Sequence, residues 1–306
     1  MQLIDQNAST RRKIRVACLG HDTYFENHYC EKSATNFLVG WFSFDHFSSD
    51  FYRDIVNFRP DITLIFRPEM HHKSDIALIP GIKIGFSSEP MPKIVNGIVQ
   101  KSTETDRRVG IFTRMDFTAY DAVYHYDQNS KDYAEQMGWP FAGYRELPVN
   151  TDFFHPFDKP EPYWDLVFVG KATPRRSDLV SALKSYNIQF LWIEHGVSGR
   201  ELADIFRRSK CILNIHADEL VALEPRIYLA AACGVPVLSD DYGHSQFPMS
   251  SFVQVIDMTK LRPAFIEKSV DAVKRRINMI PDTDIASQVV QLSAESFVRD
   301  VISRYA

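Results

Sequence analysis

Short apolar segments alternate with polar and helix-forming segments along nearly the whole chain. In the first half, four runs of β-favouring apolar residues are each followed by a polar cluster. These runs predict buried strands at 13–19, 61–66, 82–86 and 122–125. Helices are predicted at 51–58, ending before Pro60, and at about 130–137. Strands that alternate with helices favour a mostly parallel sheet.

The second half repeats this alternation. Strands are predicted at 164–169, 190–193, 211–215, 235–238 and 252–256, and the chain after them reads as helical. A length of 306 residues favours two domains. We therefore predict an α/β protein with two Rossmann-like domains facing a cleft, at 1–155 and 156–306. The helices from about Thr283 onward are expected to pack back on the first domain.

Composition narrows the class of protein. A hydrophobic content of 45% and a charged content of 24% are ordinary for a globular protein with a full core. The net charge of -4 argues against non-specific nucleic-acid binding as the main role, although a nucleic acid stays open as an acceptor. The four cysteines form no CxxC pair, which favours a reducing, cytoplasmic location.

No membrane-spanning segment is expected. Residues 1–13 are polar and the apolar run after them is short, so the sequence does not predict a signal peptide. The longest apolar run, 227–238, is interrupted by Gly234 and Pro236 and is too short to cross a bilayer. Peripheral association with a membrane stays open.

Polar residues follow the predicted strands of the first half. His21 and Asp22 follow the first strand, Glu69 the second and Glu89 the third. Ligands of parallel α/β sheets bind beyond the carboxyl ends of the strands, so these side chains are candidate site residues.

Two predicted helices in the second half begin with cations. Arg226 follows Pro225, which suits the first helical position, and Gly234 can end that helix. A cation opposes the helix dipole at this end, and the conflict disappears if an anion binds there. The alternative is a solvated surface arginine.

The same pattern occurs after the strand at 164–169. Gly170 and Lys171 follow this strand, and Thr173 can cap a helix that carries Arg175 and Arg176 in its first turn. Two such helix starts on one predicted sheet favour a phosphate or carboxylate ligand over solvated charge.

Several common motifs are absent from the sequence. It contains no G-x-G-x-x-G, Walker A or G-x-S-x-G sequence, so a nicotinamide or flavin enzyme, a P-loop protein and an α/β-hydrolase are not favoured. His71-His72 lacks a third metal ligand and is predicted to lie in a surface loop. Asp240-Asp241 could bind a cation or form an ordinary loop at a strand end. We expect no cofactor and no metal.

The segment 211–242 resembles the donor-binding motif of GT-B glycosyltransferases, in particular the CgeB-like branch of the group 1 C-terminal domain. The matching residues are Leu213-Asn214, Asp218-Glu219, Arg226, Tyr228, Ala231-Ala232-Cys233-Gly234 and Ser239-Asp240. The segment 147–156 resembles the interdomain signature of that family, and its alternative is an ordinary loop with two prolines.

The resemblance implies metal-independent transfer of a sugar from a nucleotide-sugar to an acceptor hydroxyl on a glycan, a lipid-linked sugar or another molecule. The first domain would bind the acceptor and the second the donor. Lysine, arginine and helix dipoles would replace Mg²⁺ as counter-charge to the diphosphate. The implied donor-binding residues are Gly170, Lys171, Arg175, Arg176, Asn214, His216, Glu224 and Arg226.

One position departs from the family pattern. Many relatives have a ribose-binding Glu four residues before the Cys, where this chain has Leu229. Either Glu224 takes this role or the nucleotide selectivity differs. Asn214 and His216 either contact the nucleotide or form a polar turn.

The general base is less constrained than the donor site. Glu89 is the first candidate, His21 and Asp22 come second, and Glu69 comes third unless it pairs with Arg67. A retaining enzyme may need no such base. Two other functions stay open: a non-hydrolysing nucleotide-sugar epimerase and a catalytically inert nucleotide-sugar-binding scaffold.

Overall fold

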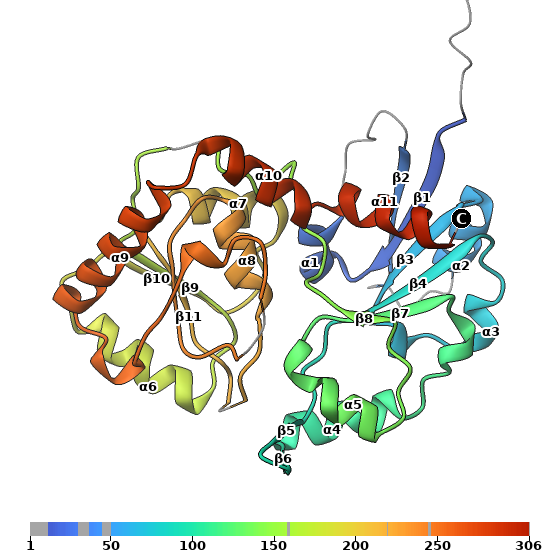
Figure 1. Ribbon diagram of the computed structural model, residues 1–306, viewed down its shortest axis with the longest axis horizontal. Helices are drawn as coiled ribbons and strands as arrows, with labels where there is room; N and C mark the ends of the chain where they lie inside the picture. Colours follow the sequence, from blue (N-terminus) through green and yellow to red (C-terminus); the bar gives the residue numbers. More distant parts are fainter. Residues whose placement is uncertain are drawn as a thin grey trace, which may run out of the picture.

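A computed structural model describes residues 12–29, 37–44, 50–157, 160–218, 220–243 and 246–305. Two lobes lie side by side, each built around a sheet (Figure 1). The sequence expectations for the terminal tail, Cys30 and Glu219 fall wholly or largely outside the described residues.

The first lobe contains a parallel sheet with the strand order β2-β1-β3-β4-β7-β8. Its strands are β1 (Ile14–Gly20), β2 (Phe37–Ser43), β3 (Ile62–Phe66), β4 (Ile82–Ser87), β7 (Ala122–His125) and β8 (Gly143–Tyr144). Its helices are α1 (Asp22–Phe25), α2 (Asp50–Phe58), α3 (Lys73–Ile76), α4 (Thr103–Phe112) and α5 (Lys131–Gln136). Short 3-10 turns include η1 (Glu26–His28), η2 (Pro68–Met70), η3 (Phe117–Ala119) and η4 (Gln128–Ser130).

The second lobe contains a parallel sheet with the strand order β10-β9-β11-β12-β13. Its strands are β9 (Leu166–Val169), β10 (Phe190–Ile193), β11 (Ile212–Asn214), β12 (Val237–Ser239) and β13 (Val253–Val255). Its helices and 3-10 turns are α6 (Pro174–Lys184), α7 (Gly199–Arg207), α8 (Pro225–Ala232), η5 (Ser250–Phe252), η6 (Met258–Lys260) and α9 (Pro263–Ile277). The two parallel sheets confirm the predicted α/β class with two Rossmann-like domains.

The last two helices connect the lobes. Helix α10 (Asp282–Leu292) leads into α11 (Ala294–Tyr305), which lies in the first lobe in Figure 1. Phe297 of α11 packs on Phe86 and Tyr124 of the first sheet, with ring centroids 5.4 and 5.7 Å away. Between the two sheets the chain runs from Tyr144 to Leu166, and the domain boundary at 155/156 stays a prediction.

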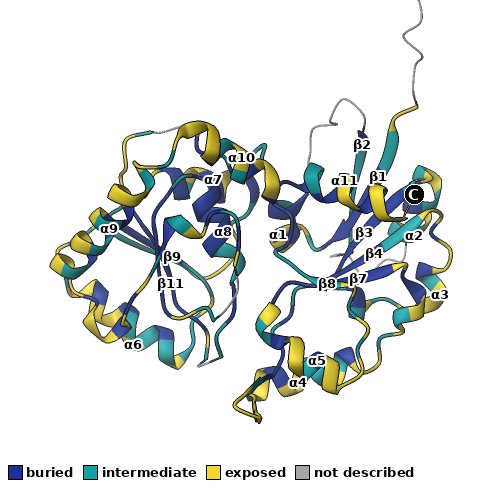
Figure 2. Cartoon of the chain, viewed as in Figure 1, coloured by how far each residue is buried: buried dark blue, intermediate teal, exposed yellow. Residues whose placement is uncertain are grey.

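The interior is dominated by aliphatic and aromatic side chains. Figure 2 shows buried residues, in dark blue, along the strands at the centre of each lobe. The largest buried cluster contains residues of both lobes, among them Phe66 and Phe86 of the first and Phe206 and Tyr228 of the second. A shared apolar core of this kind holds the two sheets in a defined relation, because separating them would expose its side chains to water.

Some elements were not foreseen from the sequence. Strand β2, helix α4, the short strand β8 and the antiparallel hairpin β5–β6 (Lys93–Val95 and Ile98–Gln100) are additions to the predicted set.

No helix in the described part of the chain has the length and apolar composition that crossing a bilayer requires.

Candidate anion site at the carboxyl edge of the second sheet

Strands β9, β11 and β12 end beside one another, and the predicted polar residues follow them. Gly170 follows β9, and a Cβ built there would lie 3.0 Å from the Phe168 ring and 3.2 Å from Arg226 Nη2. The same atom would lie 3.4 Å from Arg176 Nη1. A glycine at this position therefore lets two guanidinium groups approach the end of the strand.

Arg176 connects two strand ends. Arg176 is only 4% exposed. Its Nε donates to the carbonyl of Ile215 at 2.9 Å, and its Nη1 donates to the carbonyl of Lys171 at 3.0 Å. Burial and the charge of Arg226 lower the pKa of Arg176 to about 10, against the opposing effect of nearby carboxylates. The electrostatic surroundings of this cation therefore favour an additional negative charge.

Arg226 lies in the first turn of α8, as predicted, after Pro225 at the first helical position. Its Nη1 donates to Asn214 Oδ1 at 2.9 Å and to the carbonyl of Ile215 at 3.2 Å, and its Nη2 lies 3.5 Å from Glu224 Oε2. The guanidinium carbon lies 5.3 Å from the centre of the Phe168 ring. Part of the conflict between Arg226 and the helix dipole is thus relieved inside the protein, by a carboxylate at the N-cap position.

Asp240 accepts hydrogen bonds from several residues of this edge. Its carboxylate accepts from Arg175 Nη1 at 2.8 Å and from the backbone N–H of His216 at 3.0 Å. His216 Nδ1 lies 2.5 Å from its Oδ1, and Asn214 Nδ2 donates to Oδ1 at 3.4 Å. Burial alone would raise the pKa of Asp240, but the bonds and charges of His216 and Arg175 outweigh it and lower the pKa. Asp240 therefore holds both basic groups in place as an ionised carboxylate.

Asn214 and His216 are buried within this network. Asn214 donates to Ser239 Oγ at 2.9 Å and accepts from Arg226. His216 is 3% exposed, and both of its ring nitrogens face protein atoms, since Nε2 lies 2.7 Å from the carbonyl oxygen of Ala222. Both side chains therefore stabilise the edge of the sheet through buried hydrogen bonds.

Lys171 differs from these groups. Its side chain is exposed, and no ion pair or hydrogen bond of its ammonium group occurs among the described residues. Lys171 is therefore a cation at the same strand end that is available to a ligand.

The first lobe contributes a residue, Tyr126, that lies close to the start of α8 in the second lobe. Tyr126, the residue after β7, is buried, and burial raises its pKa well above the ordinary value. The charges of Asp127, Glu224 and Glu89 raise this pKa further. Glu224 of the second lobe and Asp127 and Glu89 of the first lobe therefore all raise the pKa of the Tyr126 phenol. The ends of β4 and β7 thus lie close to the start of α8.

Glu89 is part of an ion-pair network. Its Oε1 lies 2.6 Å from Arg67 Nη1 and its Oε2 lies 2.5 Å from Arg108 Nη1, while Glu69 Oε1 lies 2.5 Å from Arg67 Nε. Burial raises the pKa of Glu89, and the two guanidinium groups oppose this rise. The predicted pairing of Glu69 with Arg67 is thus present, and each Glu89 oxygen also contacts an arginine.

His21 and Asp22 lie at the end of β1, separated from β4 by β3. Asp22 is exposed and its Oδ1 accepts from Trp41 Nε1 at 2.5 Å. These two residues and Glu89 therefore occupy different strand ends of the same edge, and the structure does not gather them into one cluster.

The histidine pair at 71 and 72 differs from the expected surface loop in one respect. His72 is exposed, but His71 is partly buried and its Nδ1 lies 2.7 Å from the Tyr52 hydroxyl oxygen. Burial lowers the pKa of His71 to about 4, so the ring is neutral at pH 7. Among the residues that the structure describes, no group of three or more metal-ligating side chains is arranged to hold an ion.

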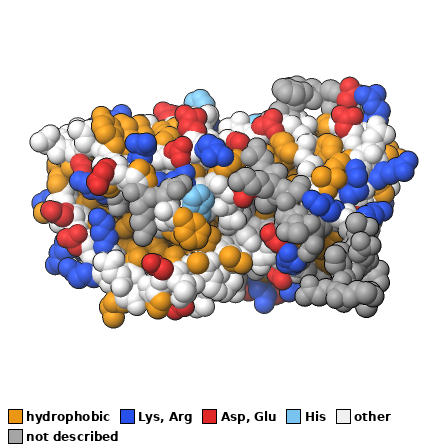
Figure 3. All heavy atoms as spheres, turned by 90° about the horizontal axis from the view of Figure 1, so that it is seen from above, with side chains coloured by type: hydrophobic (Ala, Val, Ile, Leu, Met, Phe, Trp, Pro, Cys, Tyr) orange, Lys and Arg blue, Asp and Glu red, His pale blue; other side chains and the backbone are white. Residues whose placement is uncertain are grey.

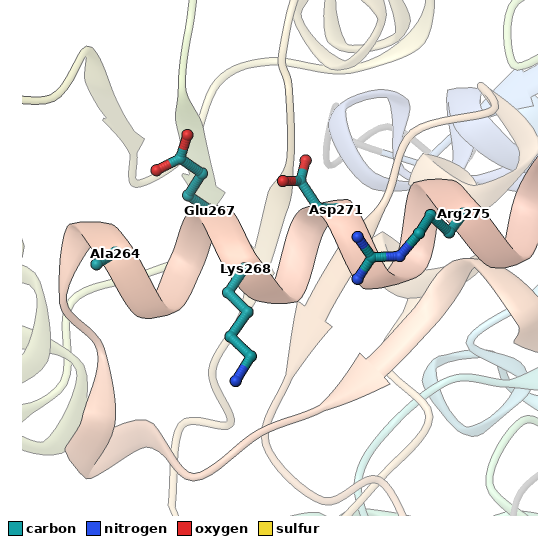
Figure 4. Close-up of a pocket in the computed structure, with 5 residues that line it drawn as sticks. All are labelled: Ala264, Glu267, Lys268, Asp271 and Arg275. Carbon is teal, nitrogen blue, oxygen red and sulfur yellow. The ribbon is translucent and has the colours of Figure 1, made fainter.

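An open hollow on α9 lies in a different part of the second lobe. Figure 4 shows Glu267 and Asp271 projecting to one side of this helix and Lys268 to the other. Charges of both signs also intermingle over the face drawn in Figure 3. These are features of a solvated surface, in contrast to the partly buried cations at the ends of β9 and β11.

Sequence reasoning did not identify some residues of these networks. Arg108 and Tyr126 were not selected, because neither belongs to a motif and each acquires its neighbours through the fold. The role of Asp240 as an acceptor for Arg175 and His216 was also not foreseen, although the residue itself belongs to the resemblance.

The chain matches no protein-family model and no curated protein. Among solved structures, it is similar to sucrose-phosphate synthase (tll1590) from Thermosynechococcus elongatus, with 11% identity, a TM-score of 0.46 and coverage of 94% of this chain and 100% of the other. The glycosyltransferase SnogD from Streptomyces nogalater matches with 11% identity, a TM-score of 0.43 and coverage of 95% and 99%. A UDP-N-acetylglucosamine 2-epimerase from Listeria monocytogenes matches with 10% identity, a TM-score of 0.42 and coverage of 92% and 91%. Likenesses this remote carry no conclusion about the function of this chain.

Proposed function

We propose that this protein is a glycosyltransferase of the GT-B type, related to the CgeB-like branch, that transfers a sugar from a nucleotide-sugar to an acceptor hydroxyl. The observation that carries the proposal is the surplus of positive charge at the carboxyl edge of the second sheet. Arg176 is buried beside Arg226, Lys171 is exposed and has no ion-pair partner among the residues that the structure describes, and Gly170 leaves room for both guanidinium groups. A diphosphate would balance this charge.

The arginines are held by backbone carbonyls rather than by flexible contacts. Arg175 donates to the carbonyl of His216, and Arg176 and Arg226 both donate to that of Ile215. Cations fixed in this way need little reorganisation when negative charge develops on the leaving nucleotide diphosphate. They can supply the counter-charge that a divalent metal supplies elsewhere.

The same geometry supports Glu224 as the partner of the ribose. Leu229 is 2% exposed and lies in the core, so it does not reach a ligand. Glu224 lies at the start of α8, with its side chain 24% exposed and its pKa lowered: burial would raise the pKa, but Arg226 and His216 outweigh it. We assign the ribose hydroxyls to this ionised carboxylate.

The acceptor belongs on the side of the first lobe, at the ends of β1 and β4. Glu89 remains the first candidate for the general base, because burial raises its pKa and thereby strengthens it as a base. Its two arginine contacts reduce that strength, and His21 and Asp22, at the end of β1, are the alternatives.

Titration of the protein with UDP-, GDP- and dTDP-sugars, followed by chromatography of the products, tests this function. We expect one nucleotide class to raise the melting temperature. At a ligand concentration of a hundred times the dissociation constant, binding should add about 2.7 kcal/mol to the free energy of unfolding. With an acceptor present, free nucleoside diphosphate should accumulate. The same accumulation should occur when EDTA is added. A new epimer formed from the donor alone would identify an epimerase, and binding without turnover across a broad acceptor panel would identify a scaffold.

A further inference from the structure

Aromatic rings gather at the carboxyl ends of β1, β2 and β3 in the first lobe. His21 follows β1, Phe44 follows β2 and His71 lies shortly after β3. The other rings belong to α1 and to the first turn of α2. The set, which we call the aromatic cluster, contains His21, Tyr24, Phe44, Phe51, Tyr52 and His71. Ligands of parallel α/β sheets bind at this edge, so the aromatic cluster lies where a substrate is expected.

The rings of the aromatic cluster form a continuous series of contacts. The ring centroid of His21 lies 4.9 Å from that of Tyr24 and 6.1 Å from that of Phe44. The Phe44 centroid lies 5.3 Å from that of His71, which in turn lies 6.0 Å from that of Tyr52. The planes of these four pairs are inclined by 47°, 79°, 80° and 83°. Rings inclined in this way do not form the parallel planes between which a flat aromatic ligand stacks.

The aromatic cluster lies outside the buried core. Leu19, two residues before His21, is fully buried, but Tyr24 is 59% exposed. The other five rings of the aromatic cluster are partly exposed. An exposed apolar patch with a polar border marks an interaction site on a soluble protein.

Polar groups border the aromatic cluster. Asp22 is exposed, and its Oδ1 accepts from Trp41 Nε1 at 2.5 Å, which occupies one of the several acceptor positions of a carboxylate. The Tyr52 hydroxyl oxygen lies 2.7 Å from His71 Nδ1. A sugar has hydroxyl groups that donate to carboxylates, and C–H groups that are attracted to the negative face of an aromatic ring. Both kinds of sugar surface therefore have partners here.

We propose that the aromatic cluster binds a saccharide, so that the acceptor of the proposed transfer is a glycan with a sugar ring packed on Tyr24. This inference rests on the proposed function and names its acceptor class. Figure 1 shows α1, which carries Tyr24, on the side of the first lobe that faces the second. The chain continues to Glu26, whose Oε2 accepts from Ser198 Oγ of the second lobe at 2.7 Å. A sugar on Tyr24 is thus near the interface between the lobes.

Two tryptophan indoles report on the two lobes separately. The indole N–H of Trp41 donates to Asp22 beside the aromatic cluster, whereas that of Trp192 donates to the carbonyl of Gly170 at the edge of the second sheet. Nuclear magnetic resonance of the ¹⁵N-labelled full chain resolves the two indole signals, and Trp41→Phe and Trp192→Phe assign them.

The probes are the methyl glycosides of glucose, galactose, mannose and N-acetylglucosamine, each titrated alone. We expect at least one glycoside to shift the Trp41 indole signal and to leave the Trp192 signal unchanged. A Trp41 signal that no glycoside shifts would overturn the proposal. A shift with 2-naphthol and with none of the glycosides would assign the aromatic cluster to flat aromatic compounds and would also overturn it.

Variants of Tyr24 test whether the ring itself carries the binding. Tyr24→Leu keeps an apolar side chain without a ring and should weaken glycoside binding by about tenfold, the upper end of what one aromatic contact contributes. Tyr24→Phe keeps the ring and should retain most of the affinity. Tyr163→Leu is the matched control, because Tyr163 is 63% exposed but precedes the second sheet. Equal affinities of Tyr24→Leu and the wild type would contradict the proposal.

Titration with UDP, GDP and dTDP separates this proposal from the proposed function. A nucleotide that binds at the second lobe should shift the Trp192 signal. If a glycoside shifts the Trp41 signal and none of the three nucleotides shifts that of Trp192, the donor site fails and the saccharide site stands. If a nucleotide shifts the Trp192 signal and no glycoside shifts that of Trp41, the saccharide site alone fails.

Discussion

Single side chains at the edge of the second sheet have two distinct roles. Arg175, Arg176 and Arg226 donate to backbone carbonyls and so contribute to the shape of the edge. Lys171 has no such bond among the described residues and is exposed. Substitutions at these positions should therefore separate loss of binding from loss of structure.

Lys171→Ala should weaken nucleoside diphosphate binding by at least about tenfold, the scale of a charge-assisted hydrogen bond, while the melting temperature stays unchanged. Calorimetry and thermal unfolding measure the two quantities. Lys268→Ala is the matched control, since Lys268 is also an exposed lysine of the second lobe but lies on α9. Equal affinities of Lys171→Ala and the wild type would remove Lys171 from the donor site.

Glu89→Gln tests both the ion pairs of Glu89 in the first lobe and its role as the general base. Breaking a buried ion pair typically costs about 3–5 kcal/mol, so the free energy of unfolding should fall on this scale, because Arg67 and Arg108 lose an ionised partner. If Glu89 is the base, turnover should also fall by about a hundredfold with unchanged donor affinity.

Glu104→Gln is the control for Glu89→Gln. Glu104 also contacts Arg108 but is half exposed, so its loss should cost little stability and no turnover. Near-normal turnover of a folded Glu89→Gln enzyme would assign the base to His21 or Asp22 or indicate a mechanism without one.

At the scale of elements, helix α7 meets the first lobe through its N-terminus. Ser198 Oγ donates to Glu26 Oε2 and the backbone N–H of Gly199 donates to Asn27 Oδ1, both at 2.7 Å. An acidic group at this end of a helix is favoured by the helix dipole. This contact therefore contributes to the relation between the lobes.

Gly199→Ala should disrupt that contact. Gly199 has a φ of 54°, and an added Cβ would overlap the carboxylate of Glu26. We expect a loss of about 1–3 kcal/mol in the free energy of unfolding, measured by denaturant titration. Gly196→Ala is the matched control, because Gly196 also has a positive φ of 87° but has nothing within 4 Å of the added atom. Equal losses in the two variants would show that only backbone strain matters.

The elements differ in how far the sequence predicts them. Strands β1, β3, β4 and β9 were predicted because each is a short apolar run with turn residues after it. The hairpin β5–β6 was not, although Asn96 and Gly97, both with positive φ, form the kind of two-residue turn that marks hairpins. The starts of α6 and α8 followed from Pro174 and Pro225, so local chemistry determined them.

The site was only partly predictable for a physical reason. Cations at helix starts are a local signal, and Arg175, Arg176 and Arg226 were found by it. The neighbours of Glu89 depend on the order of strands in the sheet and on where α4 packs, which no local pattern contains. Whether the assigned residues bind a donor remains a prediction.

At the scale of the whole molecule, buried histidines make stability depend on pH. Burial lowers the pKa of both His28 and His125 to about 4 from an ordinary value of 6.5. His28 lies between the lobes, with its Nδ1 2.8 Å from the carbonyl oxygen of Pro148 and its ring 6.4 Å from that of Tyr228. Both rings are neutral in the folded protein at pH 7.

Acid should therefore destabilise the fold in a defined range. Below pH 6.5 the unfolded chain binds protons that the folded chain does not, so stability is lost as the pH falls from about 6.5 to about 4. The loss is up to about 3 kcal/mol for each histidine. Denaturant titrations of the wild type and of His28→Gln at several pH values measure it. A variant with the same pH dependence as the wild type would show that His28 does not contribute.

The position of α11 has a consequence for synthesis on the ribosome. Phe297 covers Phe86 and Tyr124, although the strands that carry them are translated long before it. At about 5–20 residues per second, more than a hundred intervening residues leave this apolar face uncovered for roughly ten seconds or longer. The nascent first lobe is thus exposed to chaperones throughout the synthesis of the second.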